Sequence, residues 1–320
     1  MHILLEKLES KIKEKLPLAI LLLALFVGAS VLAFLPVPKS ASSAAVSPQA
    51  GVGVIASGDY KARIAYVSEE VNPAKGIQTK IVLGDTVSRM VALGIIDLGK
   101  IEALYKNRGG VPPEEMKLLT STSTTPLVVN ADNATWLVNL LWPLGLANHL
   151  DVNNQSPIAG KNVGNYASTG GWSLGKEATG GGYFNKYPLV PLTPAQEKRV
   201  QQIAESTYRP CCDNSSFFQD CNHGSAAMGM IELGVSEGLS DAEIDQTLLA
   251  FNSFWFPHNY VEIALYFNVA KNTDWKDVDP QVALSKQYSS LSSWMKNIDG
   301  PVQKIPGLIP QTAGGGSCGA

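Results

Sequence analysis

Hydrophobic and polar positions divide the chain into one long apolar segment near the N-terminus and a series of shorter periodic segments after it. Residues 17–36 carry no charge. A helix of that length rises about 30 Å, the thickness of the hydrocarbon core of a bilayer. Four lysines precede the segment and only Lys39 closely follows it, a bias that places the N-terminus in the cytoplasm. The pattern predicts an uncleaved transmembrane signal anchor.

The anchor sets the expected layout of the chain. Residues 1–16 are the predicted cytoplasmic tail, and residues 37–58, rich in Pro, Ser, Ala and Gly, are a flexible linker. Residues 59–299 form the predicted extracytoplasmic domain, and residues 300–320 are a Pro/Gly-rich tail. A cleaved signal peptide is the competing interpretation of the apolar segment, although the apolar core of such a peptide is normally shorter.

Apolar residues at spacings of three and four dominate the domain, so we expect it to be mainly α-helical. Predicted helices begin near Asp85, Pro112, Asn130, Thr193, Asp220, Ser240 and Asp279. The segment from Asn130 to His149 is apolar on nearly every face and contains Pro143, which predicts a buried, kinked central helix. Thr193 and Ser240 each open a capping-box pattern.

Two segments depart from the helical pattern. Residues 62–66 and 77–83 alternate between apolar and polar positions on either side of the turn-forming residues 72–76, which predicts a small β-hairpin. Residues 150–192 contain many glycines and scattered aromatic residues without any period. Because aromatic residues argue against disorder, we expect a long ordered loop that packs over the domain and is a candidate to cover the cysteine site described below.

Composition and charge narrow the possible partners. The chain is 45% hydrophobic and 17% charged, with a formal net charge of −3. No stripe of Lys and Arg interleaved with aromatic residues is present, so nucleic acid is not an expected partner. The membrane is the one partner that the pattern predicts, through residues 17–36.

The chemistry of the chain concentrates between Pro210 and Met230. Cys211, Cys212 and Cys221 lie here, and His223 follows two residues after the third cysteine. If Asp220 caps a helix, Cys221 and His223 fall at its first turn, where the helix dipole favours a thiolate. These residues are therefore the predicted site.

Soft-metal binding or thiol redox chemistry is the function that this cluster favours. Three thiolates and an imidazole, from Cys211, Cys212, Cys221 and His223, suit zinc. A set that includes Met228 or Met230 suits copper, although both methionines also fit a helix core. In a redox function the glycine-rich C-terminal tail would bring Cys318 to the vicinal cysteines.

A structural disulfide is an alternative, because thiols outside the cytoplasm become oxidised. Cys221 would then pair with Cys211 or Cys212 and close a short loop. Such a chain would be a non-enzymatic surface domain. A structural or adhesive surface protein without any chemistry is a further alternative.

Asp220-Cys221-Asn222-x-Gly224 resembles the Asp-Cys-Ser-Gly element of NlpC/P60-type cysteine peptidases, which cleave cell-wall peptides. The segment from Pro257 to Tyr266 resembles the strand that carries the histidine base in that family. The resemblance implies that Cys221 is a nucleophile and His258 its base.

Overall fold

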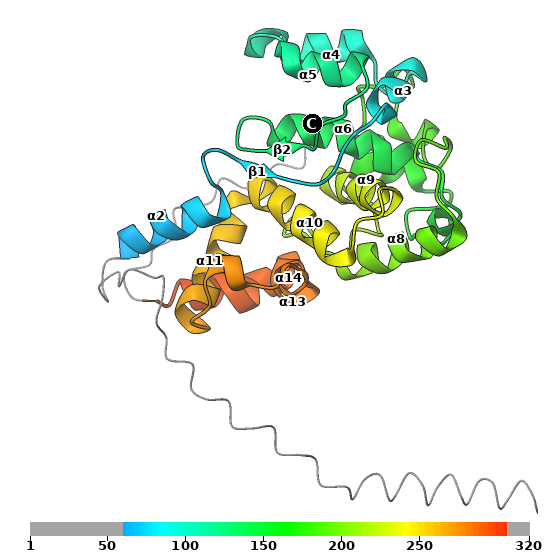
Figure 1. The fold of residues 1–320 in the computed structure, drawn as a ribbon. Helices are drawn as coiled ribbons and strands as arrows, with labels where there is room; N and C mark the ends of the chain where they lie inside the picture. The colour runs from blue at the N-terminus through cyan, green and yellow to red at the C-terminus, as the bar shows by residue number, and fades with distance from the viewer. Residues whose placement is uncertain (1–59, 306–320) are drawn as a thin grey trace, which may run out of the picture. The chain divides into compact units, whose positions relative to one another are not determined.

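The computed structural model describes residues 60–305, which are mainly helical, as the sequence predicts (Figure 1). The longer helices are α2 (Tyr60–Val71), α3 (Thr86–Ala92), α4 (Leu98–Tyr105), α5 (Pro113–Thr120), α6 (Ala134–Ala147), α8 (Pro194–Ser206), α9 (Asn222–Ser236), α10 (Asp241–Trp255) and α11 (Pro257–Ala270). Shorter helical segments are η1 (Lys106–Arg108), η2 (Asp151–Gln155), η3 (Val163–Asn165), α7 (Ala167–Gly170), η4 (Gly180–Gly182), η5 (Trp275–Asp277), α12 (Pro280–Ala283), α13 (Lys286–Ser289), α14 (Leu291–Trp294), the π-helical η6 (Met295–Asp299) and α15 (Gly300–Val302).

The predicted cytoplasmic tail, transmembrane anchor and linker (residues 1–58) lie outside the described residues, as do residues 306–320 with Cys318. Within residues 60–305, no helix is both long enough and apolar enough to cross a bilayer.

The predicted β-hairpin is wrong. Its first strand is helix α2, in which Val67 and Val71 are four residues apart and fully buried. Helical spacing therefore outweighs the alternation, because α2 buries this stripe against the domain, mainly on α11. A small antiparallel sheet does form, but between β1 (Ile77–Gln78) and the distant β2 (Val128–Val129).

The helix predicted from Asp85 is divided into α3 and α4. Gly94 adopts a left-handed conformation (φ +75°) just after the end of α3, which stops the helix. Asp97 then caps α4 by accepting a hydrogen bond from the backbone N–H of Lys100 at 3.1 Å. Asp85 makes no such side-chain bond.

Helices α6 and α9 form the centre of the domain and make its most extensive helix–helix contact (Figure 1). Nearly every residue of α6 is buried, as predicted, and Pro143 lies inside the helix. The two backbones touch at Gly145 and Gly229. A Cβ at Gly145 would lie 2.0 Å from the Ser225 carbonyl oxygen, so only glycine permits this approach.

Residues 150–192 form an ordered segment built from short turns and α7. Trp172 and Tyr183 are buried in it, and the Trp172 Nε1–H donates to the Ile95 carbonyl at 2.9 Å. Ser168 donates through its hydroxyl to the Gln219 carbonyl, and its N–H donates to the Asp220 carbonyl. The segment thus packs against the residues that immediately precede Cys221.

Both predicted capping boxes are confirmed, at Thr193 before α8 and at Ser240 before α10. The single helix predicted from Asp279 to Asn297 is wrong. Ser285 and Ser290 have extended backbones there, and they separate the short helices α12, α13 and α14.

Candidate functional site

Helix α9 begins one residue later than predicted. Its N-cap is Cys221, whose thiol accepts the backbone N–H of Gly224 at 3.4 Å. Asp220, the predicted cap, turns its carboxylate elsewhere. Cys221 is 5% exposed, so its sulfur lies in a buried position at the positive end of the helix dipole.

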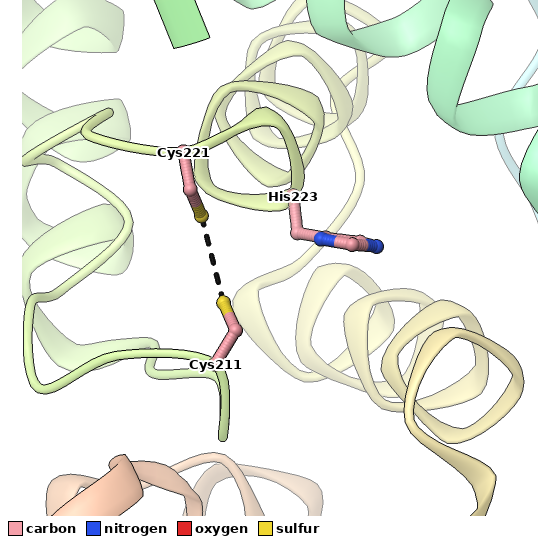
Figure 2. A group of neighbouring side chains, drawn as sticks. All are labelled: Cys211, Cys221 and His223. Carbon is pink, nitrogen blue, oxygen red and sulfur yellow. Dashed lines mark hydrogen bonds between the residues drawn. The ribbon is translucent and has the colours of Figure 1, made fainter. Parts of the chain in front are cut away.

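A return loop brings Cys211 to Cys221. The loop is closed by Ser216, whose N–H donates to the Thr207 carbonyl at 2.9 Å, and the Cys212 carbonyl accepts from the Leu291 N–H at 3.0 Å. As a result, the sulfurs of Cys211 and Cys221 point at each other and are 3.5 Å apart (Figure 2). The two thiols are close enough to share a proton or a metal ion.

Arg209 lies at the centre of this loop and is only 1% exposed. Its Nε donates to the Cys221 sulfur at 3.1 Å, and its Nη2 forms an ion pair with Asp220. The same guanidinium donates to the carbonyls of Asn214 and Phe218. A buried cation is thereby paired with two acidic groups and two backbone acceptors, which is what burial of a charge requires.

Gly224 makes room for this arginine. A Cβ at that position would lie 2.4 Å from the Arg209 Nη2. Any other residue would therefore displace the guanidinium from Cys221.

The environment favours a thiolate at Cys221. Hydrogen bonds from the Cys211 and Cys212 thiols, followed by the nearby charge of Arg209, hold the pKa of Cys221 well below its usual value despite its burial. Cys212 shifts the other way: its hydrogen bond with Cys211 lowers the pKa, but its hydrogen bond with Cys221 and its burial together raise the pKa of Cys212 to about 11. Of these two thiols, Cys221 is the one that ionises first.

His223 also comes from the first turn of α9, and its ring extends to one side of the two sulfurs rather than between them (Figure 2). Its ring packs on Trp255 and Phe256, with centroids 5.3 Å and 4.6 Å away. Burial lowers the pKa of His223 to about 4, so the imidazole is neutral near pH 7. Its Nδ1 is buried and has no hydrogen-bond partner among residues 60–305. A neutral imidazole with a free buried nitrogen is suited to bind a metal ion.

The four predicted ligands form two overlapping sets rather than one. Ligand atoms of Cys211, Cys221 and His223 all lie within 4.8 Å of one another, and so do those of Cys212, Asp220 and Cys221. Cys221 belongs to both sets. The sequence prediction placed these cysteines and the histidine in one cluster, but it did not divide them into two sets or include Asp220.

The other candidate residues lie apart from this cluster. His258 is in helix α11, with its Nε2 3.4 Å from Glu262 and its ring against Trp294, and no interaction joins it to Cys221. Met228 and Met230 are buried in the hydrophobic core. The pair of Cys221 and His258 implied by the peptidase resemblance is therefore not brought together.

Sequence reasoning missed the buried charged side chains, among them Arg209, Glu232 and Glu262. Arg209 stands directly before the stretch that begins at Pro210, and its place beside a cysteine-rich motif was the available signal. Glu232 and Glu262 are also buried, and neither carboxylate has a hydrogen-bond partner in the described part of the chain. Desolvation raises the pKa of each, to about 8 for Glu262. Both glutamates lie in helices whose neighbouring residues are mostly apolar, and no pattern in the sequence indicated that these carboxylates are buried.

Comparisons with known proteins add no family and no function to this geometry. No protein-family model, curated protein or solved structure matches the chain.

Proposed function

We propose that this protein binds a soft metal ion, copper(I) or zinc, through Cys211, Cys221 and His223. The observation that carries the proposal is the approach of two sulfurs and an imidazole within 4.8 Å, together with a buried His223 Nδ1 that has no other partner. Thiolate and neutral imidazole are the protein ligands that these metals prefer.

The spacing of the sulfurs agrees with a shared ion. Two thiolates bound to one tetrahedral zinc at about 2.3 Å are about 3.8 Å apart. The Cys211 and Cys221 sulfurs are 3.5 Å apart, so a metal would need only a small outward movement. Three protein ligands leave a tetrahedral zinc with one open position, whereas they complete the coordination of a three-coordinate copper(I) ion.

Arg209 would act as an outer partner of such a site. Its Nε–H bonds to the Cys221 sulfur at 3.1 Å and fixes the side chain from the side away from solvent. Hydrogen bonds of this kind orient metal ligands and help to tune the metal. The positive charge also offsets one of the two thiolates in a buried place.

The test compares metal content and thermal stability of the reduced full-length chain, with Cys318→Ser in every variant so that the tail thiol is removed. We expect one equivalent of zinc or copper in this parent. We expect Cys211→Ser, Cys221→Ser and His223→Phe to weaken binding by more than about 100-fold. Phenylalanine keeps the packing on Trp255, so loss of binding there reports the nitrogen.

Added metal should raise the stability of the parent by about 2.7 kcal/mol at about 100 times its Kd, with no gain for the three variants. His149→Phe serves as the matched control, because the His149 side chain is 49% exposed and lies outside the cluster. A reduced parent that holds less than about a tenth of an equivalent of zinc and copper contradicts the proposal.

Dithiol–disulfide exchange is the second candidate, and the 3.5 Å separation of the Cys211 and Cys221 sulfurs favours it. A disulfide requires about 2.05 Å, so oxidation needs the two side chains to close by about 1.5 Å. Thiol counting under denaturing conditions, on protein from an oxidising compartment, tests it. Four free thiols there would refute this candidate.

The proposal includes a location. Residues 17–36 would anchor the chain in the cell membrane, with residues 59–299 outside the cytoplasm, because lysines precede the apolar segment. Protease added to intact cells should digest the domain and spare residues 1–16. A domain that is protected until the cells are lysed would contradict this orientation.

A further inference from the structure

The metal site proposed above, formed by Cys211, Cys221 and His223 and called the resident site below, does not use the second ligand set. Its members are Cys212, Asp220 and Cys221, whose ligand atoms lie within 4.8 Å of one another. We propose that this set is an exchange position, through which the metal passes between the resident site and a thiol-bearing donor or acceptor. The inference rests on the proposed function.

The shared ligand makes such a step possible. A metal held by Cys211, Cys221 and His223 can keep its bond to Cys221 while the other ligands are replaced. The bond to the Cys211 sulfur breaks as a bond to the Cys212 sulfur forms, and the His223 nitrogen is replaced by an oxygen of the Asp220 carboxylate, the group that also pairs with Arg209. Cys212 gives up a proton and Cys211 takes one, so neither the total charge nor the oxidation state of the metal changes. No intermediate requires a free ion.

The two sets differ in strength in the direction that release requires. The resident set offers an imidazole where the exchange set offers the Asp220 carboxylate. Soft metals prefer nitrogen and sulfur to carboxylate oxygen, so the exchange set should hold the ion less tightly. The Cys212 sulfur lies 3.7 Å from Asp220 Oδ1 and 3.9 Å from the Asn214 carbonyl oxygen, and it also hydrogen-bonds to the Cys211 and Cys221 thiols. It is therefore already in contact with the groups between which the metal would move.

The exposure of the ligands allows an exchange partner to approach. Cys221, the ligand common to both sets, is 5% exposed, whereas Cys211 and Cys212 are both half-buried and the Asp220 side chain is 18% exposed. An incoming thiol therefore approaches the metal at a ligand other than Cys221. On the exchange set that thiol can displace a carboxylate, whereas on the resident set it has to displace a thiolate or the imidazole, which soft metals hold more tightly.

In the experiment, the reduced Cys318→Ser chain is loaded with copper(I) and mixed with glutathione. The transfer of copper to glutathione is followed by stopped-flow measurement of the copper–thiolate absorption. Cys212→Ser is the decisive variant, since serine keeps a donor toward Asp220 but does not bind soft metals. We expect the transfer rate to fall at least about tenfold, with a far smaller loss of equilibrium affinity.

Two results would overturn the inference. An unchanged transfer rate would exclude Cys212 from the route. A loss of affinity as large as that of Cys211→Ser would make Cys212 a resident ligand, so that the exchange position would not exist. A parent chain that binds no copper is a separate outcome, because it defeats the proposed function before any transfer is measured.

Discussion

Helix α9 is buried by different means at its first turn and along its middle. At the first turn, buried charges neutralise one another: Arg209 is paired with Cys221 and Asp220. In the middle, the backbone of α9 meets that of α6 at Gly145 and Gly229, with no charge involved. The first region is stabilised by specific charged partners, and the second by the absence of side chains between two helices. The first should therefore be destabilised by removal of a charge, and the second by addition of a methyl group.

The largest effect is expected at Arg209. Arg209→Met removes the guanidinium, leaves the Cys221 thiolate and Asp220 without their cation, and frees two backbone carbonyls. Breaking a buried ion pair in this way costs about 3–5 kcal/mol of unfolding free energy. Denaturant unfolding of the full-length chain measures it.

Arg199 provides the matched control. It pairs with Asp241 at the surface, where its side chain is 30% exposed and that of Asp241 is 63% exposed. Exposed ion pairs contribute about 0–1 kcal/mol. Equal losses from Arg199→Met and Arg209→Met would mean that the buried charge cluster does not stabilise the return loop.

A smaller but clear loss is expected at the glycine contact. In Gly145→Ala the added methyl group meets the Ser225 carbonyl and the Gly229 backbone, so α6 and α9 must separate. We expect a loss of about 2–3 kcal/mol, the usual range for overpacking. Gly164→Ala is the control, because nothing lies within 4 Å of a Cβ there. If both variants are equally stable, the close helix contact is not needed.

The smallest effect concerns pH. Burial and the nearby charge of Asp299 raise the pKa of Glu262 to about 8 from a usual value of 4.5. Between these values the native chain keeps a proton that the unfolded chain has lost, so the unfolding free energy falls as pH rises through this window. Glutamine cannot titrate, so from about pH 5 to about pH 8 the unfolding free energy of Glu262→Gln should fall by about 2 kcal/mol less than that of the parent.

Unfolding curves at several pH values measure the slope. Glu114→Gln is the control, because the Glu114 side chain is 81% exposed, and it should keep the slope of the parent. A Glu262→Gln slope that also matches the parent would show that Glu262 titrates normally.

Local signals in the sequence predicted much of the helical domain. The capping boxes at Thr193 and Ser240 involve residues three positions apart, so they need no tertiary contact to form. The segment around Pro143 is apolar on all sides, which leaves burial as its only stable state. The β-hairpin prediction was wrong because Val67 and Val71 are buried where α2 packs on α11, a helix that is distant in the sequence. A pattern within the segment itself cannot show that partner.

For the candidate site, neighbours along the chain were enough to show which side chains are available and that a helix starts at Cys221 and His223. The approach of the Cys211 sulfur to Cys221, and the pairing of Asp220 with Arg209 instead of a cap on α9, follow from contacts that form only in the folded chain. The difference is one of distance along the sequence. A helix start is fixed by neighbours along the chain, whereas the charge and reactivity of a buried thiol depend on groups that only folding brings within a few ångströms.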